Sequence, residues 1–181
     1  FCCHCFGSTP NGPLHIGILL VKVIYLSAVQ NLCAHPFFLV GRHTALVGRR
    51  EPGLYPNETP ELRALINKYA AFHDIPASLI HRVIQRESDY RPRARNGPYW
   101  GMMQILPETA RTMGHRGPAS ALLDAETTLI YAGRYLRGAW IVSDGDEAEA
   151  VMWYARGYYY EARDRCLLIE TGLANRERCG R

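Results

Sequence analysis

The sequence predicts an all-α domain, and three observations lead to this fold class. Apolar residues make up 48% and charged residues 21% of the 181 residues, a composition typical of globular chains and not of disordered or collagen-like ones. After residue 58, apolar side chains recur at intervals of three and four positions, which is the period of a helix with one buried face. In the same region no stretch of useful length alternates between apolar and polar residues, as a half-buried strand would. We expect roughly five or more helices joined by short loops.

The first helix is expected over residues 60–73. Thr59 is a good N-cap, and Pro60 suits the first helical position. The helix carries an apolar stripe of Leu62, Leu65, Ile66 and Tyr69. A second helix begins at Pro76 and ends in the polar loop 89–98, and its stripe consists of Leu79, Ile80, Val83 and Ile84.

Three more helices follow along the chain. A short one is expected at Pro107–Met113, closed by Gly114. Asp124 caps a longer helix, which has one face formed by Leu129, Ala132, Gly133, Leu136 and Trp140. The turn Ser143–Gly145 separates it from a last helix, for which we expect a buried face of Ala148, Val151, Met152 and Ala155.

These elements divide the chain into four parts. We expect an apolar tail at residues 1–50, a turn-rich linker at 51–58, a helical domain at 59–165 and a C-terminal extension at 166–181. In the tail, Ile16–Val29 is a nearly continuous apolar run, shorter than the roughly 18 uncharged residues of a membrane-spanning helix. Such a run is typical of the core of a secretory signal or of a buried helix. We interpret the tail as a degenerate export signal, a membrane-proximal anchor or an artefact of a wrongly assigned start.

The net charge of +4 arises in the tail, which holds basic residues and no Asp or Glu, while the rest of the chain has equal numbers of basic and acidic side chains. Overall charge therefore gives no reason to expect nucleic-acid binding. One local cluster is positive and suits either an anionic partner or a solvated face: Arg82, Arg86, Arg91, Arg93 and Arg95.

The six cysteines fall into two groups, with Cys2, Cys3, Cys5 and Cys33 in the tail and two near the other end. The two C-x-x-C pairs that structural zinc sites use are not both present, so we expect no metal site and no cofactor. A Cys166–Cys179 disulfide is the favoured pairing. It would close a loop worth about 3 kcal/mol in an oxidising compartment.

Glu87 is the first candidate for chemistry. The stripe of the second helix, extended from Val83 and Ile84 by three or four positions, reaches this carboxyl group at the helix C-terminus. Burial and the negative end of the helix dipole both favour the protonated form and raise the pKa, as a general acid requires. The alternative is a solvated Glu at a frayed helix end, paired with Arg86 or Arg91.

Short motifs then follow in a regular order. The pair Glu87-Ser88 at a helix end precedes Gly101–Gln104, which matches a Gly-Leu-Met-Gln pattern. After these come Pro107-x-Thr109-Ala110, Met113-Gly114 and finally Trp153–Gly157, the last against Ala-Tyr-Asn-x-Gly. The segment from about Glu61 to Tyr160 thus resembles the catalytic domain of soluble lytic transglycosylases, the goose-type-lysozyme-like family that cuts bacterial cell-wall glycan. The resemblance implies a lysozyme-like helical domain.

Two positions depart from the family pattern. Ala155 stands where the family has Asn, so a hydrogen bond expected from that position is missing or supplied elsewhere. Pro98–Trp100 places bulky aromatic residues where the family has smaller ones. Their rings either offer stacking faces to sugars or roof the core.

The resemblance implies cleavage of the β-1,4 bond between N-acetylmuramic acid and N-acetylglucosamine by one carboxyl group, Glu87, as acid and then base. The substrate's own N-acetyl group assists, and a 1,6-anhydro end results. Most glycosidases use two carboxylates. Here Asp89 is expected to face away from Glu87, and Glu108 is better explained as compensation of a helix dipole.

Supporting roles are carried over position by position. Gly101 would permit close approach to glycan, and Gln104 would bond the glycan or orient the acid. Met103 would contact the acetamido methyl group or fill the core. Tyr154 would place its hydroxyl near the acid, and Ser88 would support local geometry or touch glycan. Further aromatic surface for a sugar groove is expected from Tyr158, Tyr159 and Tyr160.

Three alternative functions remain: a hydrolytic muramidase on the same fold, a glycan-binding module whose catalysis has lapsed, and a bare helical interaction module. The first two, like the lytic enzyme, act on peptidoglycan strands and require export to the periplasm or cell envelope. Membrane association through the tail is a further expectation. Loss of the family Asn at Ala155 favours the lapsed module.

Overall fold

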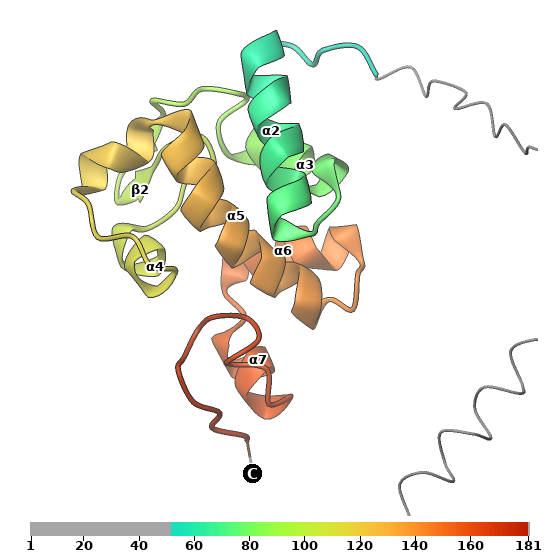
Figure 1. Cartoon of the computed structure of the whole chain (residues 1–181), viewed down its shortest axis with the longest axis vertical. Helices are drawn as coiled ribbons and strands as arrows, with labels where there is room; N and C mark the ends of the chain where they lie inside the picture. The colour runs from blue at the N-terminus through green and yellow to red at the C-terminus, as the bar shows by residue number, and fades with distance from the viewer. Residues whose placement is uncertain (1–51, 181) are drawn as a thin grey trace, which may run out of the picture. The chain divides into compact units, whose positions relative to one another are not determined.

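The computed structural model describes residues 52–180, so the predicted features of the tail lie outside the described residues. Within that range the all-α prediction is confirmed, because helices make up nearly all of the regular structure (Figure 1). The elements in chain order are α2 Pro60–His73, α3 Ala77–Glu87, β1 Arg95–Asn96, β2 Tyr99–Trp100, α4 Pro107–Thr112, the 3-10 helix η1 Ala119–Leu123, α5 Ala125–Val142, α6 Glu147–Arg156 and α7 Tyr159–Asp164.

Side-chain caps set two helix starts as predicted. Thr59 Oγ1 accepts from the Leu62 N–H at 3.3 Å at the start of α2, where Pro60 occupies the first turn. Asp124 Oδ2 accepts from the Thr127 N–H at 2.8 Å at the start of α5. These short-range bonds satisfy N–H groups that have no partner within the helix, which is why both starts could be located from the sequence.

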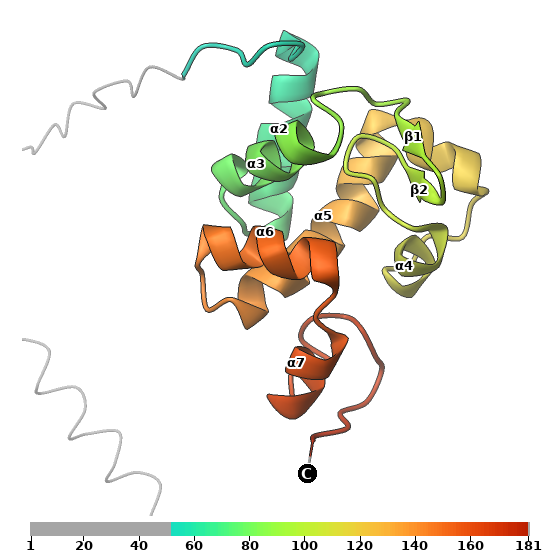
Figure 2. The same ribbon diagram turned by 180° about the vertical axis from the view of Figure 1, so that it is seen from behind.

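The helix α5 is the centre of the fold. It packs against α2 on one side and α6 on another, and it also contacts η1 and α4 (Figures 1 and 2). The predicted face of α5 is buried at Leu129, Ala132, Gly133 and Leu136. Burial of this stripe and of the matching stripe on α3 forms the hydrophobic core that holds the helices together.

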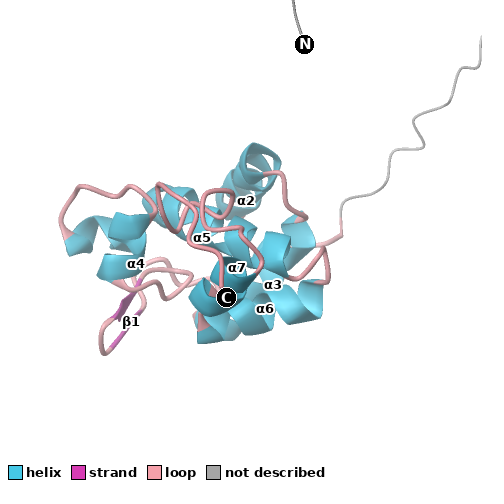
Figure 3. Ribbon diagram, turned by 90° about the horizontal axis from the view of Figure 1, so that it is seen from below, coloured by secondary structure: helices cyan, strands magenta, loops and turns pink. Residues whose placement is uncertain are grey.

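A small hairpin interrupts the helical pattern after α3. The strands β1 and β2 are antiparallel, with Arg95 opposite Trp100 and Asn96 opposite Tyr99. Figure 3 shows β1 at the margin of the helical unit, beside α4. With two residues in each strand, the hairpin is too short to produce an alternating pattern in the sequence.

The predicted face of the last clear helix is largely wrong, because only Val151 of its four residues packs against the core. Ala148, Met152 and Ala155 are exposed, and the buried residues of α6 are Ala150 and Tyr154. The small Ala150 and the large Tyr154 ring lie four positions apart, on the edge of α6 that packs into the core. Counting aliphatic residues overlooked this face, because Tyr154 needs a tertiary partner for its hydroxyl before it can be buried.

The core draws on residues on both sides of the expected 59–165 domain. Tyr55 packs against it from the N-terminal side, and Leu168 is fully buried on the C-terminal side. The predicted Cys166–Cys179 disulfide is present and closes the segment that carries Leu168. None of the described helices combines the length and the apolar character that a membrane crossing requires.

Candidate active site

Glu87 is the last residue of α3, one turn beyond the buried Val83 and Ile84. Its side chain is 23% exposed, so it is half-buried where the apolar stripe reaches the surface. It opens into a pocket of about 350 Å³, whose lining residues are Arg86, Glu87, Asn96, Tyr99, Gln104, Tyr154 and Ala155. The predicted acid therefore lies in a concave site built from α3, the hairpin, the loop before α4, and α6.

Burial raises the pKa of the Glu87 carboxyl group above its ordinary value. The Arg86 guanidinium, with Nε 3.7 Å from Glu87 Oε1, acts in the opposite direction but does not cancel the effect. The raised pKa increases the protonated fraction near neutral pH, which is what a general acid needs.

A second pocket of about 210 Å³ adjoins the first. The two share Tyr99, Gln104, Tyr154 and Ala155 as lining residues. The second continues along the start of α4 and the α6–α7 turn, past Thr109, Tyr135 and Gly157. Together they form one groove with Glu87 at one end, and we call it the Glu87 groove.

The loop 101–104 forms one wall of this groove and is tied to α3 and α6. Ser88 Oγ donates to the Met102 carbonyl at 2.6 Å, and Tyr154 Oη donates to the Met103 carbonyl at 2.9 Å. Ser88 is 2% exposed and is not one of the groove-lining residues. It therefore acts as the link between the end of α3 and this loop.

The four predicted residues of the loop play different parts. The Met103 side chain is fully buried in the core, so its carbonyl and not its thioether matters near the groove. Gln104 lines both pockets, and its Nε2 donates to the Gly101 carbonyl at 2.8 Å. Gly101 has φ +77° and its Cα faces the interior, where an added Cβ would overlap the Leu122 carbonyl oxygen. Glycine is needed there for packing within the protein.

Tyr154 lines the same pocket as Glu87. It lines both pockets, and burial together with the negative charge of Glu87 raises the pKa of its hydroxyl well above the ordinary value. The hydroxyl stays protonated and can donate a hydrogen bond at any physiological pH. Ala155, next in the chain, is exposed and lines both pockets, so no side-chain hydrogen bond comes from this position.

Comparison with protein families gives one match, the transglycosylase SLT domain, over residues 64–164. This span is more than half of the chain and contains α3, the loop 101–104 and α6. The chain belongs to this family. The comparison with curated proteins and the comparison with solved structures found no match. Membership of this family implies the general activity of lytic transglycosylases on peptidoglycan.

The aromatic residues of the SLT domain divide between core and groove. Tyr99, 43% exposed, lines both pockets. Tyr158 was expected to extend a sugar-binding surface, and this expectation is wrong. Its side chain is 1% exposed, and its hydroxyl donates to the Tyr135 carbonyl at 2.8 Å. Tyr159 and Tyr160 are exposed but line neither pocket of the Glu87 groove.

Sequence reasoning missed two groove residues, Asn96 and Tyr135. Asn96 belongs to a two-residue strand without a sequence signature. Tyr135 precedes Leu136 of the buried face of α5 and stacks edge-on against Tyr154 with ring centroids 5.4 Å apart. Burial raises its pKa to about 12. Its place on the flank of an amphipathic helix is the only sequence signal that pointed toward it.

Within residues 52–180, which the structure describes, no second carboxylate joins Glu87 in lining the groove. Asp89 is turned toward Asn57, whose Nδ2 donates to Asp89 Oδ2 at 2.7 Å. Glu108 is 77% exposed in the first turn of α4 and lies 3.7 Å from Arg111. Both observations agree with the sequence-based reasons for setting these two carboxylates aside.

A larger cavity of about 990 Å³ lies elsewhere, between the segment Tyr90–Ala94 and the start of α5. Neither Glu87 nor Tyr154 lines it, and Asp124, the one carboxylate among its described lining residues, is occupied in capping α5. Size alone does not make it the site of chemistry. In the described residues 52–180, no group of three or more His, Cys, Asp or Glu side chains is arranged to hold a metal ion.

Proposed function

We propose that this SLT domain cleaves the β-1,4 bond between N-acetylmuramic acid and N-acetylglucosamine without water and leaves a 1,6-anhydro end. One observation carries the proposal. Glu87 is a half-buried carboxyl group with a raised pKa, and among the residues that the structure describes it is the only carboxylate that lines the groove. A hydrolytic two-carboxylate mechanism needs a second group within roughly 5–9.5 Å on the other side of the bond.

In the first step, protonated Glu87 donates its proton to the glycosidic oxygen. The C–O bond at the anomeric carbon of N-acetylmuramic acid breaks while the acetamido oxygen of the same sugar bonds to that carbon, which gives an oxazolinium ion. N-acetylglucosamine leaves with the proton. Because the acetamido oxygen takes the place of a protein nucleophile, one carboxyl group is sufficient.

In the second step, the Glu87 carboxylate accepts the proton of the sugar's 6-hydroxyl group. The 6-oxygen bonds to the anomeric carbon, and the oxazolinium ring opens to restore the acetamido group. Glu87 is protonated again, and no water has been consumed. The half-buried site suits both states, because the carboxyl group is neutral before each cycle and charged only beside a cationic intermediate.

The groove supplies contacts for the glycan on either side of the bond. Tyr99 offers an exposed aromatic face for a sugar ring. Gln104 offers amide atoms for hydrogen bonds, and the Tyr154 hydroxyl holds the loop 101–104 at a fixed distance from α6. Ser88 and Gly101 are proposed to support this arrangement from outside the groove, and Met103 from the core.

The location that follows from this substrate is the periplasm or cell envelope. The Cys166–Cys179 disulfide supports it, because structural disulfides persist in oxidising compartments. Association with a membrane through residues 1–50 stays a prediction from the sequence.

A second candidate, a glycan-binding module without activity, is favoured by Ala155, which leaves the groove without the side-chain amide of the family pattern.

To separate the enzyme from the binding module, the chain is incubated with purified peptidoglycan and the released muropeptides are examined by mass spectrometry. We expect products one water lighter than hydrolytic ones. Glu87→Gln should lower their rate of release about 10²- to 10⁴-fold, and the matched control Glu108→Gln should not.

Other outcomes assign the site differently. Products with hydrated reducing ends that depend on Glu87 would make the domain a muramidase. Binding to sacculi without release of any product would favour the module. Unchanged release by Glu87→Gln would overturn the assignment of the acid.

A further inference from the structure

The turn that follows the acid has an unfavourable backbone. Asp89 and Tyr90 both have positive φ, 51° and 61°, directly after Glu87 and Ser88. The N–H groups of Ser88 and Asp89 both donate to the Ile84 carbonyl, at 3.0 and 2.9 Å. A tyrosine in the left-handed region is a genuine outlier. Such backbone persists only where neighbouring structure holds it, so the partners of Asp89 and Tyr90 decide how the chain leaves α3.

The partner of Asp89 comes from the segment before α2. Residues 52–58, which we call the strap, precede the first described helix in the chain. Asn57 of the strap donates from Nδ2 to Asp89 Oδ2 at 2.7 Å, across 32 positions of sequence. Asn57 also has positive φ, 62°. Asn and Asp are the residue types, apart from glycine, that best tolerate this conformation.

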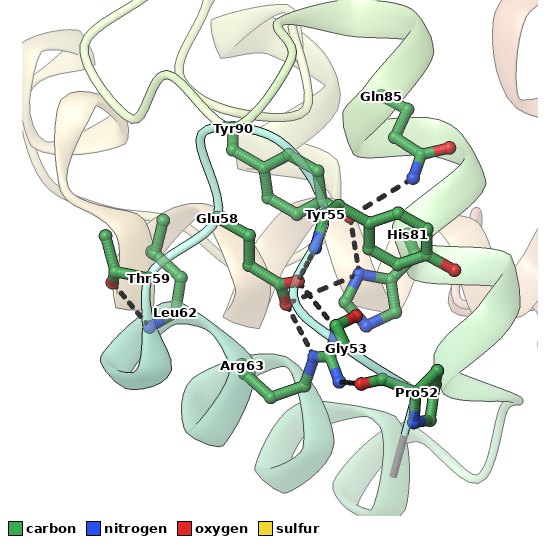
Figure 4. A network of polar contacts seen from close by, with 10 residues as sticks. All are labelled: Pro52, Gly53, Tyr55, Glu58, Thr59, Leu62, Arg63, His81, Gln85 and Tyr90. Atoms are coloured by element: carbon green, nitrogen blue, oxygen red, sulfur yellow. Dashed lines mark hydrogen bonds and ion pairs between the residues drawn. The ribbon is translucent and has the colours of Figure 1, made fainter.

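The partners of Tyr90 come from the strap and from α3 (Figure 4). Its ring stacks on the Tyr55 ring of the strap at a centroid distance of 5.9 Å and an interplanar angle of 15°. Its hydroxyl lies 2.7 Å from His81 Nδ1 and accepts from Gln85 Nε2 at 3.5 Å. Tyr90 is thereby buried to 3% exposure.

The strap is itself anchored through a buried ion pair. Both carboxylate oxygens of Glu58, whose side chain is 0% exposed, accept from Arg63 of α2 at 2.6 Å. Glu58 also accepts from the Tyr55 N–H at 2.8 Å. Arg63 donates further to the Pro52 and Gly53 carbonyls, at 2.9 and 3.2 Å. A bidentate pair of this kind fixes direction as well as distance, so the strap cannot shift without breaking buried contacts.

We propose that the strap is a positioning element of the active site, which holds the turn Asp89–Tyr90 and through it the carboxyl group of Glu87 in the groove, and that Asn57 is a positioning residue. This inference rests on the proposed role of Glu87. It extends the functional unit beyond the family match, which begins at residue 64 and leaves the strap out.

The position of the strap also determines which kinetic parameter it controls. None of its residues lines either pocket of the Glu87 groove. The strap therefore has no contact with glycan to lose, and its disturbance should lower kcat while leaving KM close to that of the wild type.

The test exchanges the two residues of the bond. Asn57→Asp places a carboxylate against Asp89 and should lower kcat on peptidoglycan about 10- to 100-fold, the effect expected from misplacing a catalytic group by about 1 Å. The double variant Asn57→Asp with Asp89→Asn restores the hydrogen bond with donor and acceptor reversed and should recover kcat. Both sites are exposed and accept either residue type in the left-handed conformation, so both variants should fold. The matched control is Asn175→Asp, an equal charge change at an exposed position.

A readout independent of turnover accompanies the kinetics. The ¹³C resonance of the Glu87 carboxyl group and the amide exchange of Ser88 and Asp89 report the turn directly. Asn57→Asp should shift the resonance and speed the exchange, and the double variant should return both to wild-type values.

The proposal would be overturned if Asn57→Asp kept the wild-type kcat and an unchanged Glu87 resonance. It would also be overturned if the double variant folded but its kcat stayed as low as that of the single variant. If the wild-type chain released no anhydro product, the proposed function would fail, while the resonance and exchange data would still decide whether the strap holds Glu87.

Discussion

Glu87 shows how a single residue couples function to stability. Burial raises its pKa in the folded domain above the unfolded value near 4.5, so the folded state binds a proton more tightly than the unfolded state. Ionisation of Glu87 therefore destabilises the folded domain. This loss of stability is absent below about pH 4.5 and is complete once the pH has risen through the folded pKa. We expect Glu87→Gln to raise Tm at pH 7 and to lose that advantage near pH 4.

Thermal unfolding of both proteins at the two pH values measures this difference, with Glu108→Gln as the exposed control. An equal gain at pH 4 and pH 7 would show that packing, and not ionisation, is responsible.

Gly101 and Gly97 allow backbone strain to be separated from steric overlap. Both have positive φ, 77° and 56°, but a Cβ at Gly97 meets no atom within 4 Å, whereas at Gly101 it overlaps the Leu122 carbonyl oxygen and lies close to Thr128 Oγ1. Gly97→Ala should cost about 1 kcal/mol, for the left-handed conformation alone. Gly101→Ala should cost roughly 1–3 kcal/mol more, because backbone must move to admit the methyl group.

Denaturant unfolding of the two variants gives both values. Similar losses at the two positions would mean that the contact with η1 yields easily and that Gly101 is not required for packing.

At the scale of elements, the junction of α2 and α5 depends on a neutral histidine. His73 ends α2, is 5% exposed, and its Nε2 lies 2.9 Å from the Leu129 carbonyl. Burial lowers its pKa below 6.5, and the charges of Arg137 and Arg134 add to this, while the Leu129 carbonyl opposes it without reversing it. The unfolded chain therefore binds the proton first as the pH falls.

Between pH 6.5 and the folded pKa, the free energy of unfolding should fall with decreasing pH, by at most about 1.4 kcal/mol per pH unit for one group. His73→Gln should be less stable than the wild type at pH 7, and the difference should narrow toward pH 5. Chemical denaturation across this range measures the two curves, and parallel curves would exclude His73 as the source.

At the scale of the whole molecule, the C-terminal segment closes the core. Leu168 is fully buried, and its N–H donates to Glu177 Oε2 at 3.1 Å within the segment that the Cys166–Cys179 disulfide closes. A loop of this length is worth about 3 kcal/mol. We expect the double variant Cys166→Ser and Cys179→Ser to lose about that much stability.

Calorimetry with and without a thiol reductant tests this prediction. The reductant should lower the Tm of the wild type toward that of the double variant and leave the double variant unchanged. A wild type insensitive to complete reduction would show that the packing of Leu168 suffices without the crosslink.

The sequence alone predicted five of the helices and pointed to Glu87 as the candidate acid, but it did not reveal η1 and α7. The caps Thr59 and Asp124 accept from N–H groups within the first turn of their helices, and Pro60 suits the first helical position. The apolar stripes of α2, α3 and α5 repeat at the helical period. Both signals involve residues close together in the sequence, so they can be recognised without the structure. The ordered motifs around Glu87 and Gly101–Gln104 led to the family for the same reason.

Only the tertiary structure decided the buried face of α6, the burial of Met103 and Tyr158, the inward direction of Gly101 and the attachment of the strap. Each depends on a partner far away in the sequence, such as the Met103 carbonyl for Tyr154 or Asp89 for Asn57. The local sequence sets the secondary-structure preference of each segment, whereas residues distant in the sequence come into contact only when the helices pack.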